Sequence, residues 1–160
     1  TEKRWLSLPR VSDDVEGKRP DHILEIFGVF EKPLLLSIES KERSSDLEQN
    51  VGDGLINYIR SLLSFVPNVE RIISPTVGSW RKAEQVLSLS NFEIISAAAY
   101  LKNSAQSSTA VFSSSNCQIL FVMEATEKGW NIEIVPSTEK ASSLKNYLLN
   151  NVKSDIINLR

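Results

Sequence analysis

The chain has one cysteine, one histidine, and no apolar run near the roughly 18 residues that a membrane-spanning helix needs. The single cysteine, Cys117, excludes an internal disulfide and a cysteine metal cluster, which predicts a reducing, cytoplasmic location. The single histidine, His22, excludes hydrolase sites that need a histidine pair and disfavours zinc sites and a Ser-His-Asp triad. Any chemistry is therefore expected to use carboxylates, lysine or hydroxyls.

Positive charge is also scarce, because 18 Lys and Arg against 20 Asp and Glu give a formal net charge of −2. This balance argues against binding nucleic acid mainly through bulk positive charge. The 160 residues, 41% hydrophobic and 24% charged, predict one soluble globular domain over residues 1–160 and no membrane association. The chain does not begin with Met, so we expect a fragment of a larger protein.

Hydrophobic patterning predicts a mixed α/β or α+β fold with helices on the faces of a central sheet. Residues 21–30 and 34–40 are predicted to be two strands joined by a tight turn. Residues 34–38 are apolar on both faces, as in a central strand covered on both sides. The other predicted elements are an N-terminal strand or extended arm, a helix from 44 or 45 to 64, a strand at 69–77, helices at 80–89 and 92–102, a serine-rich loop at 103–116, strands at 117–125 and 130–135, and a helix at 137–152.

Charged residues gather where the strand at 34–40 ends. Side chains alternate along a strand, so Glu39 and Lys41 are predicted to lie on one face. If the strand at 21–30 pairs antiparallel with it, Asp21 lies beside the same end. Two carboxylates there form a hard oxygen site suited to Mg²⁺, with Mn²⁺ as a substitute. Lys41 can donate to a phosphoryl oxygen, which indicates phosphodiester hydrolysis.

The residues Pro20-Asp21 and Glu39-Ser40-Lys41 resemble the PD-(D/E)xK motif of the restriction-endonuclease-like nucleases. The resemblance covers residues 20–41. It implies that Asp21 and Glu39 bind Mg²⁺ with the Ser40 carbonyl as a further ligand, and that Lys41 is catalytic. It also implies a restriction-endonuclease-like mixed central sheet flanked by helices, with the motif on a strand hairpin that a helix follows.

The context of the tripeptide separates this match from a chance one. An acid-x-Lys tripeptide also occurs at Glu16-Gly17-Lys18, but only Glu39-Ser40-Lys41 ends a buried-strand pattern. Pro-Asp occurs once in the chain, one strand upstream. The alternative is a surface ion pair at a strand end, which contributes about 0–1 kcal/mol in an exposed setting.

Six further residues are candidates for the metal site or for contacts with DNA. Glu16 is either an additional metal-site acid or part of a solvated loop, and Gln49 is a polar candidate in the helix that follows the motif. Glu42 and Arg43 either contact phosphate or face solvent. Trp80 and Trp130 either stack on bases or pack in the core.

The predicted function is a Mg²⁺-dependent DNA endonuclease, most like the cleavage domain of a type II restriction enzyme acting on double-stranded DNA. Recognition would come from a domain absent from this chain or from a second copy in a homodimer. One alternative is a structure-specific repair or Holliday-junction nuclease. The other is a non-catalytic α/β domain that binds nucleic acid or protein.

Overall fold

The computed structural model describes residues 3–6, 20–64, 71–74, 79–82, 89–104 and 106–160. No helix in these ranges is both long enough and apolar enough to cross a membrane. The chain divides into two compact units, the first formed by Thr1–Ile38 and Asp53–Ile95 and the second by Glu39–Gly52 and Ser96–Arg160. Each unit is described by itself below.

The first unit contains the predicted strand hairpin. β2 (His22–Ile26) pairs antiparallel with β3 (Leu34–Ser40), from Ile26 opposite Leu34 to His22 opposite Ile38. β1 (Lys3–Leu6) pairs antiparallel with β2, so the predicted N-terminal strand is confirmed over these residues. Leu34, Leu35 and Leu36 are buried, as expected for a strand covered on both faces.

Two further elements belong mainly to the first unit. Helix α1 (Val51–Ser64) follows β3 along the chain, and a second, two-stranded sheet pairs β4 (Arg71–Ser74) with β5 (Ser79–Lys82). β4 confirms part of the strand predicted at 69–77. β5 contradicts the helix predicted at 80–89 over residues 80–82, and residues 83–88 lie outside the described part of the chain.

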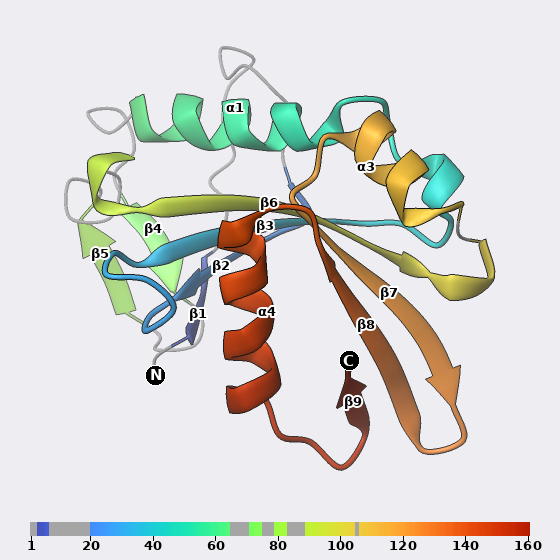
Figure 1. Cartoon of the computed structure of the whole chain (residues 1–160). Coiled ribbons are helices and arrows are strands. Elements are labelled where there is room, and N and C mark those ends of the chain that lie inside the picture. Colours follow the sequence, from blue (N-terminus) through green and yellow to red (C-terminus); the bar gives the residue numbers. More distant parts are fainter. Residues whose placement is uncertain (1–2, 7–19, 65–70, 75–78, 83–88, 105) are drawn as a thin grey trace. The chain divides into compact units, whose positions relative to one another are not determined.

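The second unit contains the C-terminal strands. β6 (Glu93–Leu101) begins in the first unit and pairs parallel with β7 (Ile119–Thr126), which pairs antiparallel with β8 (Gly129–Pro136). β9 (Ile157–Leu159) is parallel to β8. Figure 1 shows β7 and β8 as a long hairpin with the short β9 beside β8. The strands predicted at 117–125 and 130–135 are thus confirmed, whereas β9 was not predicted.

Helices complete the second unit. They are α3 (Ser108–Ser115), α4 (Glu139–Asn151) and the short 3-10 helices η1 (Ser44–Asp46) and η4 (Lys102–Ser104); η3 (Leu89–Asn91) lies in the first unit. α4 contacts β8, and its N-terminus is capped by Thr138, whose hydroxyl accepts a hydrogen bond from the Ala141 N–H at 3.1 Å. This helix confirms the one predicted at 137–152.

The main sheet has seven strands among the described residues, in the order β1-β2-β3-β6-β7-β8-β9. The Glu93 N–H donates to the Pro33 carbonyl at 2.9 Å, and the Lys41 N–H donates to the Ala99 carbonyl at 2.9 Å. These bonds follow the same order along both strands, so β3 and β6 run parallel. A sheet with parallel and antiparallel pairs, together with three α-helices in the described residues, confirms the α/β class.

The helix predicted at 92–102 is wrong, because residues 93–101 form strand β6. Ala97, Ala98 and Ala99 favour a helix by local propensity, and that propensity misled the prediction. In the structure β6 lies between β3 and β7 in the sheet order, and residues 95–100 are all buried. Small side chains fit a strand that is covered on both faces, so the sheet overrides the local preference.

The start of α1 and the segment at 103–116 also differ from the prediction, and side-chain hydrogen bonds explain both differences. α1 begins at Val51 rather than at residue 44 or 45, because the Ser44 hydroxyl accepts from the Gln106 N–H at 3.1 Å and Asn50 adopts a left-handed φ of 57°. The serine-rich segment predicted as a loop contains helix α3. The Ser107 hydroxyl caps this helix by accepting from the Ala110 N–H at 3.2 Å, and a left-handed Asn116 ends it.

Gly52 lies where the start of α1 approaches the end of α3. A Cβ atom at Gly52 would collide with the backbone of Asn116, the residue that ends α3. The side chains of Asn116 and Asn50 are hydrogen-bonded at 3.0 Å, and the Asn50 N–H donates to the Ser114 carbonyl at 2.6 Å. Within the second unit the end of α3 is therefore fixed to the segment that follows β3.

Candidate functional site

The candidate site lies at the end of β3, where the sequence predicted charged residues to share one face. Glu39 is buried, with 2% of its side chain exposed, and its Oε1 atom lies 3.4 Å from the Nζ atom of Lys41. The other carboxylate oxygen, Oε2, is buried and has no hydrogen-bond partner among the described residues. Lys41 is 33% exposed, so the ion pair has one buried member and one that reaches solvent.

Burial makes this ion pair unusual. Removing a carboxylate from water costs several kcal/mol, and one lysine at 3.4 Å satisfies only part of its hydrogen-bonding capacity. Buried carboxylates in folded proteins normally accept hydrogen bonds at both oxygens. Glu39 therefore has one oxygen available to a cation or to a proton donor.

Backbone hydrogen bonds hold this segment against β6. The Lys41 N–H donates to the Ala99 carbonyl at 2.9 Å, and the Leu101 N–H donates to the Glu42 carbonyl at 3.1 Å. Ser40, whose carbonyl is the predicted metal ligand, is the last residue of β3 and directly precedes the anchored Lys41. The Ser40 side chain is exposed.

A buried tyrosine lies across from Lys41 in the second unit. In a parallel pair, the bond from the Lys41 N–H to the Ala99 carbonyl puts Lys41 opposite Tyr100. Tyr100 has no exposed surface, and its hydroxyl has no hydrogen-bond partner among the described residues. Burial, and then the negative charges of Glu133 and Cys117, raise the pKa of Tyr100 above its usual 10.0. The phenol thus stays protonated at neutral pH and remains a potential donor.

Asp21, the other predicted metal ligand, belongs to the first unit, whereas Glu39 and Lys41 belong to the second. Asp21 is exposed and directly precedes β2. The register of β2 and β3 ends with His22 opposite Ile38. In the sequence Asp21 directly precedes His22, and Glu39 directly follows Ile38.

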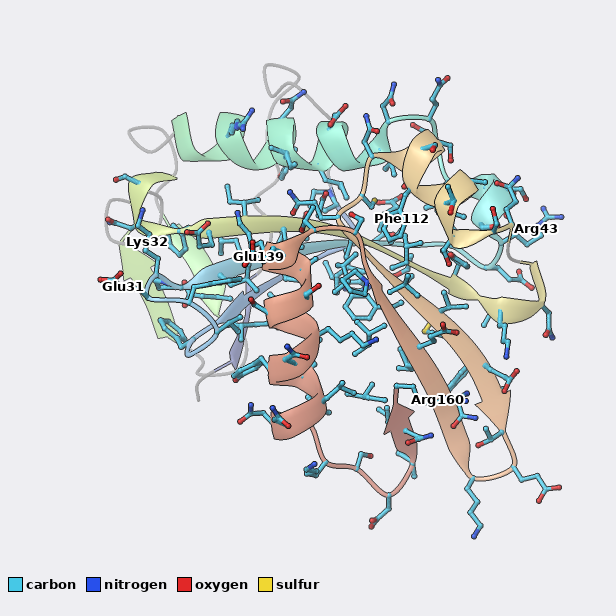
Figure 2. The ribbon with its side chains drawn as sticks, viewed as in Figure 1. Glu31, Lys32, Arg43, Phe112, Glu139 and Arg160 are labelled. Carbon is cyan, nitrogen blue, oxygen red and sulfur yellow. The ribbon has the colours of Figure 1, made fainter. Side chains whose placement is uncertain are left out.

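The remaining predicted residues are placed as follows. Arg43 is 65% exposed and pairs with Asp46 at 3.1 Å, and Figure 2 shows it at the surface beside η1. Glu42 is exposed. Gln49 is exposed and lies in the turn before α1, so its predicted place in a helix is wrong. Glu16 lies outside the described residues.

Sequence reasoning did not select Glu25 or Tyr100. Glu25 is 1% exposed in the first unit, in the middle of β2 opposite Leu35. An acid between Leu24 and Ile26 in a strand was the available signal. Tyr100 was missed because its segment was predicted to be a helix. A helix would not place Tyr100 opposite Lys41, as strand β6 does.

Few side-chain oxygen atoms at this site could bind a hard cation. Among the residues that the structure covers, no three Asp, Glu, His or Cys side chains form a group that could hold a metal ion. The buried Oε2 atom of Glu39 is nevertheless an oxygen of the kind that Mg²⁺ prefers. Mg²⁺ keeps several of its waters and binds through one or two carboxylates, so the site fits Mg²⁺ better than a cation that needs a protein cage.

Comparisons with known proteins give no family for this chain. No family model, no curated protein and no solved structure matches it.

Proposed function

We propose that this chain is a metal-dependent nuclease domain of the PD-(D/E)xK type that hydrolyses phosphodiester bonds in double-stranded DNA. The observation that supports this most is the Glu39 carboxylate, which is 2% exposed, 3.4 Å from Lys41, and has one buried oxygen without a hydrogen-bond partner among the described residues. Such an arrangement lowers stability, and titratable groups in costly surroundings are concentrated at functional sites.

Asp21 and Glu39 would hold the metal, with the Ser40 carbonyl as a third ligand. A bound Mg²⁺ lowers the pKa of the attacking water and neutralises charge on the phosphate. The match of Pro20-Asp21 and Glu39-Ser40-Lys41 to the motif supports the assignment of these two acids. Solvent and a phosphate oxygen would supply the ligands that the protein does not.

Lys41 would stabilise the negative charge that develops on the phosphoryl oxygens. Its ammonium group is paired with Glu39 and its side chain is 33% exposed, so Lys41 can contact a substrate while it holds the carboxylate in place. Tyr100, opposite Lys41 and protonated at neutral pH, would remain a hydrogen-bond donor on this side of the site.

The order of elements supports a restriction-endonuclease-like fold as the finer assignment. The motif residues flank the β2–β3 hairpin, and α1 follows β3, which is the arrangement that the resemblance implies. We assign the type II restriction cleavage domain as the closest activity, acting in the cytoplasm. Because the formal net charge is −2, target recognition would come from a further domain or a second copy.

The test is a plasmid cleavage assay with Mg²⁺ at low ionic strength, combined with Mn²⁺ binding measured by electron paramagnetic resonance. Glu39→Gln keeps the shape of the side chain and removes its charge, so it should abolish cleavage and weaken Mn²⁺ binding at least tenfold. Glu31→Gln, at the exposed turn before β3, makes the same change in charge and should affect neither. Lys41→Met should abolish cleavage and leave Mn²⁺ binding intact.

Two results would reject the nuclease assignment. One is a wild-type protein that binds no Mn²⁺ and cuts neither plasmid nor branched duplex. The other is a Glu39→Gln variant that cleaves like the wild type. Faster cleavage of branched than of linear duplex would favour the structure-specific nuclease over the restriction enzyme.

A further inference from the structure

A polar pocket of about 240 Å³ lies in the second unit, between the turn of the β7–β8 hairpin and the segment that leads into β9. The residues that matter among those lining it are Lys128, Trp130, Asn131, Asp155, Ile156 and Asn158. None of them belongs to the Glu39 site.

Backbone contacts fix the walls of this pocket. The Trp130 N–H donates to the Ile156 carbonyl at 2.7 Å, and the Asn158 amide donates to Asn131 Oδ1 at 3.3 Å. Gly129 allows the hairpin turn and the segment before β9 to approach closely, because a Cβ atom at Gly129 would collide with the backbone of Ile156. The pocket thus lies where the paired strands β8 and β9 meet the hairpin turn and the segment before β9.

Its apolar lining is exposed to solvent. Among the side chains that the structure describes, the exposed large hydrophobic ones are Trp130, at 40%, and Ile156, at 59%, and both line this pocket. Exposed aromatic surface with polar groups around it is typical of a binding site. Trp130 therefore does not pack in the core, which was one of the two sequence interpretations.

The chemistry of the lining suits a nucleotide within a strand. An exposed indole can stack on any base, and single-strand binding combines such stacking with contacts from basic residues to the phosphates. Lys128, in the exposed hairpin turn, can contact a phosphate, while Asn131, Asn158 and Asp155 offer donors and acceptors to a base edge. The volume is below the roughly 300–1,000 Å³ of pockets for drug-sized ligands, so it suits a single ring system.

We propose that this pocket binds an unpaired base of a nucleic-acid strand, with Trp130 stacking on the base and Lys128 contacting the adjacent phosphate. The proposal rests on the nuclease function proposed above, since it names how the substrate strand is held. It implies that, in double-stranded DNA, the pocket holds a base that is frayed or flipped out of the duplex.

The test measures binding without cleavage, by fluorescence anisotropy of a labelled single strand at low salt in the presence of EDTA. Trp130→Ala should weaken strand affinity by about tenfold, within the range of roughly 5- to 150-fold that corresponds to one stacked base. Trp130→Phe keeps an aromatic face and should retain most of the affinity. Circular dichroism would check that both variants are folded.

A charge control accompanies the aromatic one. Lys128→Ala should weaken strand binding. It should also reduce the slope of the logarithm of the binding constant against the logarithm of the salt concentration by about one. Lys32→Ala removes the same charge from an exposed turn in the first unit and should leave binding unchanged.

Three results would overturn the proposal: unchanged strand affinity in Trp130→Ala, equal wild-type affinity for a blunt duplex and a strand, and competition by thymidine monophosphate as strong as that by the strand. The last would mean that the pocket serves a free nucleotide. Glu39→Gln separates the two proposals, because it should bind the strand like the wild type. A wild type that never cleaves but loses strand binding with Trp130→Ala would defeat only the nuclease assignment.

Discussion

Two Lys–Glu pairs in the second unit have the same length and different surroundings. Lys41 lies 3.4 Å from Glu39, and Lys102 lies 3.4 Å from Glu124. The carboxylate of the first pair is 2% exposed, whereas that of the second is 39% exposed. Lys102 is 51% exposed against 33% for Lys41.

The difference shows that distance alone does not identify a functional pair. In water the carboxylate oxygens of Glu124 keep their hydration, and such a pair changes stability by about 0–1 kcal/mol. Glu39 has lost its hydration, and Lys41 compensates for only part of that loss. A site that keeps a partly satisfied buried charge is a better candidate for chemistry than one that keeps a solvated pair.

The largest expected effect comes from breaking the buried pair. Lys41→Ala should lower the free energy of unfolding by about 1–3 kcal/mol, because it leaves the Glu39 carboxylate buried without its cation. Glu39→Gln in the same protein should restore most of that loss, since no buried charge remains. Urea unfolding of the two single variants and the double variant measures both effects. A loss in Lys41→Ala that Glu39→Gln does not restore would mean that Lys41 stabilises through its packing rather than its charge.

A smaller effect is expected at Tyr100, whose buried hydroxyl has no hydrogen-bond partner among the described residues. Its pKa is raised in the folded protein, so above pH 10 the unfolded chain loses this proton while the folded protein keeps it. The stability that the phenol contributes is therefore complete below pH 10 and is lost as the pH rises further. Tyr100→Phe should change stability by less than about 1 kcal/mol at neutral pH and should reduce the alkaline loss.

Urea unfolding across this alkaline range checks the Tyr100 prediction. Tyr147→Phe is the control, because it removes a second buried hydroxyl and leaves Tyr100 in place. An identical alkaline loss in Tyr100→Phe and the wild type would assign the pH dependence to other groups.

The parts of the fold that local patterns determine were predicted from the sequence. β2, β3, β7 and β8 show strand-type runs of apolar residues, and α4 has its own capping residue, Thr138. β6 was missed because Ala97 to Ala99 favour a helix locally, while the neighbouring strands that make it a strand lie far away in sequence. β9 is three residues long and depends on pairing with β8, which no local pattern reveals.

The sequence predicted which charged residues of the site lie together, but it did not predict how deeply they are buried. Strand alternation predicts that Glu39 and Lys41 share a face, and the structure brings them together. The 2% exposure of Glu39 depends on tertiary packing that no local pattern specifies, so the sequence allowed an exposed pair equally well. The pocket at Trp130 combines the hairpin turn with the segment before β9, and it was not visible while β9 was unknown.

The smallest expected effect is at the exposed pair, Lys102–Glu124. A double-mutant cycle with Lys102→Ala and Glu124→Ala should give a coupling free energy below about 0.5 kcal/mol, and added salt should reduce it further. The cycle with Lys41→Ala and Glu39→Ala should give a coupling at least twice as large and less sensitive to salt, because water screens a buried carboxylate poorly. Equal couplings in the two cycles would mean that water reaches Glu39 as freely as Glu124. The argument from burial to function at the end of β3 would then fail.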